Sequence, residues 1–278
     1  MKLKGKVALV TGASRGIGAG IARCMAGEGA TVVVNYLRAE SAARQVVRQL
    51  EELGGGGIAL QADVGDYQQV KAMVERAIAE VGKVDILVTN AGVTGPGKPL
   101  AETSPDEFMA IVHNHLIGAY NCAHVLLPHM RTYGRADIQF ISSRNTASCP
   151  PNAAAYNAAK SGIETMAKGL AKEERYHGIR VNVVAPGLVE TDMTREDIAA
   201  TTGITDMRKV DEGMPFGRLL QPDDVGHLCA FLASPEASHI SGEVIYVRGG
   251  VGAEPSSFYL TGPRSYTTYG SQSHATAR

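Results

Sequence analysis

The side chains best suited to chemistry in this chain are a phenol and an ammonium four residues apart, Tyr156 and Lys160. On a helix this spacing places both on one face. A tyrosine in water has a pKa of about 10, and a neighbouring ammonium would lower that pKa by stabilising the phenolate. Ser143 follows an apolar run and could donate to an oxygen on which charge develops. Together these residue types indicate acid–base work on a carbonyl or an alcohol.

A glycine-rich pattern near the start indicates a phosphate-bearing ligand. The pattern Thr11-Gly12-x-x-x-Gly16-x-Gly18 lies between a short apolar run and a helical pattern. In a strand–turn–helix unit such glycines allow a tight turn, close approach to a pyrophosphate, and helix–strand packing. Free N–H groups and the helix dipole then favour the anion. Beside the Tyr–Lys pair, this loop predicts hydride transfer with a nicotinamide, held by Gly12, Ser14, Arg15, Gly16, Ile17 and Gly18.

The end of the second apolar run indicates which nicotinamide is bound. An acid there would accept the ribose hydroxyls and repel a 2′-phosphate. The run ends in Asn35 and Tyr36, and no carboxylate occurs before Glu40. Arg15 and Arg38 could instead pair with a phosphate. We therefore predict NADP(H) rather than NAD, with Asn35, Tyr36 and Arg38 near the ribose, although Arg38 could simply be a solvated residue before a helix.

The elements that must position these residues alternate between strand and helix patterns. Almost entirely apolar strands are buried on both faces, and alternation with helices implies right-handed crossovers and a parallel sheet. We predict one Rossmann-type, doubly wound α/β domain over 1–250, with a mostly parallel seven-stranded sheet covered by helices on both faces. The predicted strands are 7–10, 31–35, 58–61, 86–88, 138–141, 180–184 and 244–247, and the helices are about 17–28, 40–53, 67–81, 104–132, 154–176 and 222–233.

Two segments depart from this alternation. The long connection at 188–213 begins where ligands bind and is predicted to be a substrate lid with a short helix near 205–210. The C-terminal tail, 251–278, is rich in Ser, Thr, Gly and Tyr and is predicted to be partly disordered. The alternative is that the tail packs against a neighbouring subunit or near the mouth of the site.

Composition excludes several classes of function. The net charge of −1 produces no strong electric field that would attract nucleic acid or an anionic membrane. No apolar run is long enough to span a bilayer. No signal peptide is recognisable, and the four cysteines are far apart, so a cytoplasmic protein is expected. His113 and His115 lie two apart, on different helix faces, so no metal site is predicted.

These motifs resemble the short-chain dehydrogenase/reductase family, and the resemblance runs from Lys6 to about Gly250. It implies a carbonyl reductase in which Tyr156 gives the proton and Lys160 also holds the ribose hydroxyls. It further implies that the backbone at Val189 and the hydroxyl of Thr191 anchor the carboxamide. The remaining implied cofactor contacts are Asp63, Val64, Asn90, Ala91, Gly92, Pro186 and Gly187.

Within the family, the segments 32–36, 180–187 and 217–222 look most like the 3-oxoacyl-carrier-protein reductase branch. That likeness implies NADPH-dependent reduction of a 3-oxoacyl thioester and a homo-oligomer, a tetramer or a dimer. A small-molecule ketone or alcohol of secondary metabolism or catabolism is the alternative substrate. A non-catalytic dinucleotide-binding sensor or scaffold is an alternative of another class, which the presence of Ser143, Tyr156 and Lys160 argues against.

Three positions depart from the family pattern. His115 stands where the family has an Asn that holds a water in a proton relay, and an imidazole could hold that water or merely fill space. Asn114 cannot replace it, because one helical position is a rotation of about 100°, unless the helix bulges. Arg144 follows the catalytic Ser and could face an anionic substrate or be a solvated loop residue. Arg248 replaces an acid that commonly ends the last strand.

Overall fold

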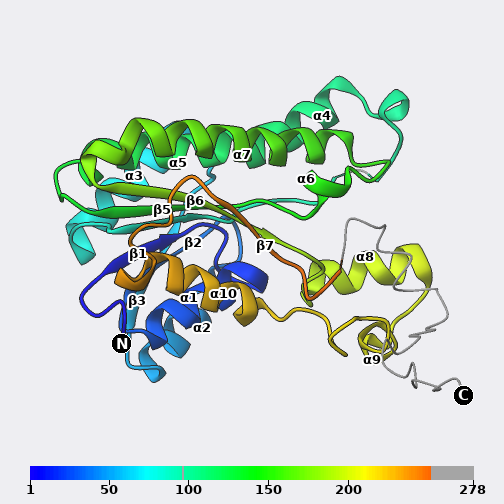
Figure 1. Cartoon of the computed structure of the whole chain (residues 1–278), viewed down its shortest axis with the longest axis horizontal. Coiled ribbons are helices and arrows are strands. Elements are labelled where there is room, and N and C mark those ends of the chain that lie inside the picture. The colour runs from blue at the N-terminus through cyan, green and yellow to red at the C-terminus, as the bar shows by residue number, and fades with distance from the viewer. Residues whose placement is uncertain (96, 252–278) are drawn as a thin grey trace, which may run out of the picture.

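A seven-stranded parallel sheet forms the centre of the molecule (Figure 1). The computed structural model describes residues 1–95 and 97–251. Every strand pair is parallel, in the order β3-β2-β1-β4-β5-β6-β7. All the predicted strands are confirmed, five of them one to three residues longer than expected. They are β1 (Val7–Val10), β2 (Thr31–Tyr36), β3 (Gly56–Gln61), β4 (Ile86–Thr89), β5 (Ala136–Ile141), β6 (Ile179–Pro186) and β7 (Val244–Val247).

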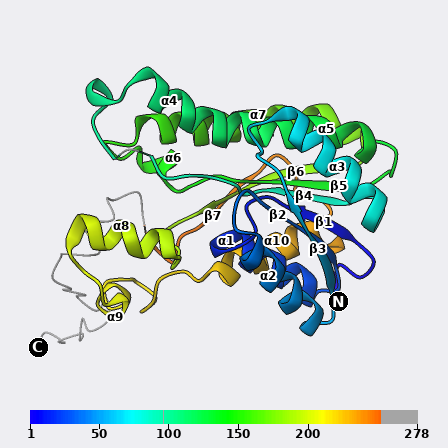
Figure 2. The same cartoon turned by 180° about the vertical axis from the view of Figure 1, so that it is seen from behind.

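Helices cover both faces of this sheet (Figures 1 and 2). Successive strand residues such as Val32 and Val33 point to opposite faces and belong to two separate apolar cores, so each face needs its own helical layer. The predicted doubly wound fold is therefore confirmed. One layer contains α1 (Gly16–Gly27), α2 (Glu40–Glu52) and α10 (Pro222–Ala233), and the other contains α3 (Tyr67–Val81), α5 (Gly118–Met130) and α7 (Ala154–Glu174).

The long helix predicted at 104–132 is interrupted by a change of helical type. It consists of α4 (Pro105–Val112), a π-helical turn over His113–Ile117, and then α5. Ser104 and Glu107 form a capping box at the start of α4. π-helical turns are often found at functional sites, and this one contains His115, one of the three positions at which the sequence departs from the pattern of the family that it resembles.

The predicted lid contains two helices, α8 (Asp192–Thr202) and α9 (Met207–Asp211). The short helix expected near 205–210 is confirmed, whereas α8 was not predicted. Ile198, Val210, Met214 and Leu219 form an apolar cluster of their own with Val251. The predicted tail at 251–278 lies outside the described residues, apart from Val251.

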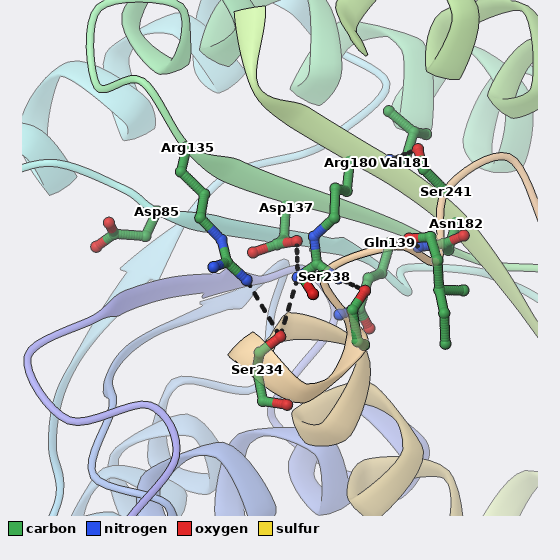
Figure 3. Close-up of polar contacts among 12 residues, drawn as sticks. Asp85, Arg135, Asp137, Gln139, Arg180, Val181, Asn182, Ser234, Ser238 and Ser241 are labelled. Carbon is green, nitrogen blue, oxygen red and sulfur yellow. Dashed lines mark hydrogen bonds and ion pairs between the residues drawn. The ribbon is translucent and has the colours of Figure 1, made fainter.

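The amino ends of the central strands are joined by a buried polar network (Figure 3). Arg180 of β6 forms an ion pair of 2.5 Å with Asp137 of β5, and both side chains are buried. Arg135 and Arg180 donate to the backbone carbonyl oxygen of Ser234, at 3.2 and 3.3 Å. The network therefore holds the segment after α10 against the sheet, at the end opposite to Ser143.

The remaining short elements lie in connections. They are the helix α6 (Asn145–Ser148) and the 3₁₀ turns Leu100–Glu102, Arg175–His177 and Pro235–Ala237. Among the described residues, no helix combines the length and the apolar character that crossing a membrane would require.

Candidate active site

The predicted phenol and ammonium lie together at the carboxyl end of β5. Tyr156 and Lys160 lie on α7, and the Lys160 Nζ is 5.7 Å from the centre of the Tyr156 ring. The same Nζ donates to the carbonyl oxygen of Ile141, the last residue of β5, at 2.7 Å. Lys160 is 4% exposed. The ammonium is therefore fixed against the strand whose end leads into Ser143.

Ser143 is oriented by its own loop. Its Oγ accepts from the backbone N–H of Asn145 at 3.2 Å, so its hydroxyl hydrogen can point elsewhere. The residues on either side are tied to β6, because the backbone N–H groups of Ser142 and Arg144 donate to the carbonyl oxygens of Val184 and Pro186. The Ser143 hydroxyl is thus a donor on a loop that backbone hydrogen bonds hold in place.

Burial dominates the acid–base properties of the pair. Burial raises the pKa of Tyr156, and the interaction with Ser143 opposes this. Burial also lowers the pKa of Lys160 to about 8. The sequence-based expectation of a lowered phenol pKa is therefore wrong for the protein chain itself, because loss of solvent outweighs the hydrogen bond with Ser143. A protonated Tyr156 is the form that can give a proton.

His115 is buried beside this pair by the π turn. It is 4% exposed, its ring meets the Tyr156 ring edge-on at 5.2 Å, and its Nε2 lies 2.8 Å from the Val93 carbonyl oxygen. Burial, and then the charge of Lys160, lower the pKa of His115 to about 3, although the hydrogen bond to Val93 raises it. The ring is therefore neutral near pH 7, which disfavours a relay in which the imidazole itself carries the proton.

Two buried polar atoms in the π turn have no hydrogen-bond partner among the described residues. They are the Nδ1 of His115 and the side-chain oxygen of Asn114. The helix does bulge here, which is the condition under which Asn114 could share the role of the family's Asn. Buried polar atoms of this kind are normally satisfied by ordered water. The turn therefore offers hydrogen-bonding groups, on uncharged side chains, next to the Tyr–Lys pair.

The glycine loop has the geometry of an anion site. Helix α1 begins at Gly16 without a side-chain cap, so its first N–H groups are available to an anion. Gly12 has a φ of +61°, and a Cβ there would lie 2.8 Å from the Ala91 Cα. A Cβ on Gly18 would lie 2.5 Å from the Gly12 carbonyl oxygen. Only glycine fits these two positions, as the phosphate-loop prediction requires.

Two asparagines hold the loop from beneath. Asn35 is 2% exposed, and its side chain accepts from the Gly12 N–H at 3.1 Å and donates to the Ala62 carbonyl oxygen at 3.2 Å. Asn90 donates to the Thr11 carbonyl oxygen at 3.0 Å. Asn35 therefore supports the loop, a different task from the predicted place beside the ribose.

The other predicted contacts surround the same edge of the sheet. Asp63 accepts from the Gly65 N–H at 2.9 Å, while Tyr36 and Val64 are largely buried. Arg15 and Arg38 are exposed. Val189 is buried and pairs with Leu220, and the Ala91 N–H donates to the Thr11 hydroxyl. Ile17 lies in the first turn of α1, Pro186 ends β6, and Gly92 and Gly187 lie in the connections that follow β4 and β6.

A hollow of about 280 Å³ opens beside the glycine loop. Beyond Ser14, Arg15 and Gly16, its walls come mostly from α1 and α2, so it is a groove between these helices that begins at the loop. A Cβ on Gly16 would lie 3.3 Å from the Thr191 methyl group, so the start of the predicted lid lies against the loop. The uncapped N–H groups and the missing Cβ atoms fit the pyrophosphate of a dinucleotide, which would lie on Gly16.

Two further sequence-based expectations are clarified. Arg144 is 6% exposed, so it is not a solvated loop residue. The Arg248 guanidinium stacks 4.7 Å from the Tyr246 ring centre at the end of β7. Within the described residues no group of His, Cys, Asp and Glu could hold a metal ion. Glu164 was not predicted to be a functional residue. Its only signal in the sequence is that it is a carboxylate four residues after Lys160, on a buried helix face.

The family model described as Enoyl-(Acyl carrier protein) reductase matches residues 12–252. The chain belongs to the short-chain dehydrogenase/reductase family. The predicted family is thereby confirmed, and this short-chain dehydrogenase/reductase is an oxidoreductase. The match includes the glycine loop, Ser143, Tyr156 and Lys160.

Named relatives of this short-chain dehydrogenase/reductase act on several kinds of molecule. A versicolorin reductase of Emericella nidulans is 40% identical over 259 residues, 90% of this chain and 96% of the relative. A 3-oxoacyl-[acyl-carrier-protein] reductase of Staphylococcus aureus is 37% identical over 248 residues, 88% and 98% of the two chains. A 7α-hydroxysteroid dehydrogenase solved with NADH and 7-oxo glycochenodeoxycholic acid is 34% identical, with a TM-score of 0.84 over 91% of this chain and 96% of that one.

Proposed function

We propose that this protein reduces a ketone to a secondary alcohol with NADPH. The observation that carries the proposal is the convergence of Ser143, Tyr156 and Lys160 at the carboxyl end of β5, with Lys160 bonded to the last residue of that strand. Ketone reduction is supported in general terms by relatives that are named reductases and dehydrogenases.

Each residue of the constellation has a distinct task. A bound NADPH supplies hydride to the carbonyl carbon. Ser143 donates a hydrogen bond to the carbonyl oxygen and stabilises the charge that develops there. Tyr156 donates its proton to the same oxygen, for which a protonated phenol is needed. Lys160 holds positive charge beside the phenol and the ribose hydroxyls, and helps to restore the proton.

The cofactor contacts proposed are those of the glycine loop and its neighbours. The N–H groups of 12–18 would hold the pyrophosphate, Asp63 and Val64 would contact the adenine, and 90–92 would lie beside the ribose. Pro186 and Gly187 lead to Val189 and Thr191, which would hold the carboxamide. Asn35 and Tyr36 would support this site from the protein interior, since both side chains are buried.

The choice of NADPH over NADH rests on Arg15 and Arg38. Both are exposed, and no acid follows Tyr36 before Glu40. The hydroxysteroid dehydrogenase was solved with NADH, so the preference requires a direct test. Arg38→Ala and Arg15→Ala should each lower the ratio of NADPH to NADH kcat/KM about tenfold to 100-fold, the worth of one charge-assisted hydrogen bond. Arg48→Ala, on the exposed side of α2, is the matched control; an unchanged ratio in both variants would contradict the assignment.

The leading substrate class is a 3-oxoacyl thioester or a related carbonyl. The versicolorin reductase and the steroid complex favour a bulky small-molecule ketone as the second candidate. Two exposed apolar side chains, Met193 in the predicted lid and Phe216 just after it, suit an apolar substrate of either class. NADPH oxidation with 3-oxoacyl-coenzyme A, a polycyclic aromatic ketone and a 7-oxo steroid would separate them. Turnover of none of the three would contradict the proposed function.

His115 is proposed as a neutral hydrogen-bonding residue in proton delivery. Its Nδ1 has no partner among the described residues, and Lys160 is close enough to lower its pKa. His115→Asn, which restores the family's residue, should shift the pH dependence of kcat. An unchanged pH profile would leave His115 as a space-filling residue.

We further propose a homo-oligomer, a dimer or a tetramer, formed through α4, α5 and α7. Ile163 and Leu170 are core residues, whereas Met109 and Tyr120 are 55% and 45% exposed. Apolar side chains left exposed on adjacent helices favour an isologous interface. Light scattering on the purified protein tests this, and a monomer would contradict it.

A further inference from the structure

A carboxylate is buried on the catalytic helix where no sequence motif requires one. Glu164 lies one helical turn after Lys160 on α7 and is 9% exposed. Its Oε1 accepts from the hydroxyls of Ser142 and Thr146, each at 2.7 Å. Both donors are uncharged. Burying a carboxylate is costly unless hydrogen bonds compensate for lost water, so a buried Glu held by hydroxyls indicates a specific task.

The two hydroxyls lie on either side of Ser143 in the chain. Thr146 Oγ1 also lies 2.8 Å from the Ser143 carbonyl oxygen and 3.2 Å from the Tyr246 hydroxyl of β7. Glu164 therefore holds both ends of the short segment that contains the catalytic hydroxyl. Backbone hydrogen bonds to β6 hold the same segment from the other side.

The helix that contains Glu164 also contains Tyr156 and Lys160. Besides Tyr156, the side chains of Lys160 and Glu164 on α7 reach the end of β5. Lys160 donates to the Ile141 carbonyl oxygen, and Glu164 accepts from Ser142 and Thr146. Ser143 and Tyr156 must meet one substrate oxygen, so their separation has to be held within a fraction of an ångström.

We propose that Glu164 is a positioning residue that fixes the Ser143 hydroxyl relative to Tyr156. The inference rests on the proposed ketone reduction, because the position of Ser143 matters to the rate only if its hydroxyl meets the substrate. Glu164 does not touch the substrate. Its effect on the reaction passes through Ser142, Thr146 and the loop between them.

Glu164→Leu removes the acceptor at similar volume, whereas Glu164→Gln keeps Oε1 as an acceptor. The Leu variant should lower kcat about tenfold to 100-fold, as expected for a misplaced catalytic group, with the Kd for NADPH within about twofold of the wild type. The Gln variant should recover most of the rate. Glu173→Leu, at an exposed position of the same helix, is the matched control. A Leu variant with wild-type kcat would overturn the proposal.

A double-variant cycle separates positioning from general damage. Because Glu164 acts through Ser143, adding Glu164→Leu to Ser143→Ala should lower kcat by no more than about twofold further. A loss equal to the product of the two single effects would overturn the proposal. Thr146→Val, which removes one of the donors, should show a smaller loss of the same kind and replaces the Leu variant if that protein does not fold.

Amide hydrogen exchange tests the inference without turnover. Glu164→Leu and Thr146→Val should speed exchange in 142–149, while Glu164→Gln and Glu173→Leu should not. Unchanged exchange in that segment would overturn the proposal. If the wild-type protein reduces no ketone, the proposed function fails, whereas the exchange result still decides whether Glu164 holds the Ser143 loop.

Discussion

Lys160 combines burial with a need for positive charge. Its pKa is lowered to about 8, its ammonium donates to the Ile141 carbonyl oxygen, and it lies beside the Tyr156 ring. Near pH 7 the charged form is still in about tenfold excess. The residue can therefore both carry charge and release a proton close to the pH at which the enzyme would work.

The pH dependence of reduction should reflect this lowered pKa. Below about 8 Lys160 is protonated and can restore the proton that Tyr156 gives away, whereas above it the charge and that proton are lost. We expect kcat for reduction, at saturating NADPH, to fall as the pH rises through about 8. A kcat that stays level up to pH 9.5 would show that Lys160 does not govern the step.

His115 should make the stability of the fold depend on pH. Its pKa in the folded protein is about 3, below the ordinary 6.5, so the unfolded chain takes up a proton first as the pH falls. As the pH falls from above 6.5 towards 3, His115 should therefore lower the free energy of unfolding. Between pH 7.5 and 5.5 this one group should account for a decrease of about 1.4 kcal/mol. Urea unfolding of the wild type and His115→Asn at both pH values measures it.

His129→Asn, at an exposed position of α5, is the control and should keep the wild-type pH dependence. His115→Asn should lose the part of the pH dependence that His115 causes in the wild type. Equal pH dependence in the wild type and His115→Asn would mean that folding does not lower the pKa of His115.

At the scale of elements, periodicity and turn residues were sufficient to predict every strand and most helices. Apolar runs bounded by glycine predicted β1 and β7 to the residue. The π turn could not be predicted, because it depends on packing between segments: the His115 ring lies against Gly92, where a Cβ would be 2.5 Å from its Cε1. Helix α8 is largely polar, with Ile198 as its main buried contact, so its periodicity was weak.

The ends of α8 did carry signals. Thr191 caps its first turn by accepting from the Thr194 N–H, and Gly203 ends it with a φ of +72°. Because this segment has no apolar periodicity, its capping residues alone were insufficient to predict a helix. Capping residues locate the ends of a helix, whereas its existence depends on tertiary contacts.

The buried ion pair of Asp137 and Arg180 should stabilise the amino ends of β5 and β6 without affecting catalysis. Burial raises the pKa of Asp137, yet the guanidinium lies 2.5 Å away. Asp137→Asn would leave Arg180 buried without its anion and should lower the free energy of unfolding by about 3 kcal/mol. Denaturant unfolding measures this, with Glu52→Gln as an exposed control. Wild-type stability, or a large loss of kcat in protein that folds, would contradict the assignment.

At the scale of the whole molecule, the site joins segments that are far apart in the chain. The glycine loop, the end of β5, helix α7 and the segment predicted to be a lid meet at the carboxyl edge of the sheet, as a doubly wound fold requires (Figure 1). Motifs predicted which segments would meet. They could not predict which side chains hold them together, such as Asn35 under the loop and Glu164 behind Ser143, because those contacts follow from packing.

Tyr156 is proposed to give the proton in NADPH-dependent reduction of a ketone. The most direct test is ketone-dependent NADPH oxidation by the wild type and Tyr156→Phe, with NADPH binding measured on both. The variant should bind NADPH within a few-fold of the wild type, while kcat falls by about 100-fold or more, the usual worth of a general acid. Wild-type turnover in the variant, or NADPH binding without turnover of any ketone in the wild type, would contradict the account and favour a dinucleotide-binding sensor.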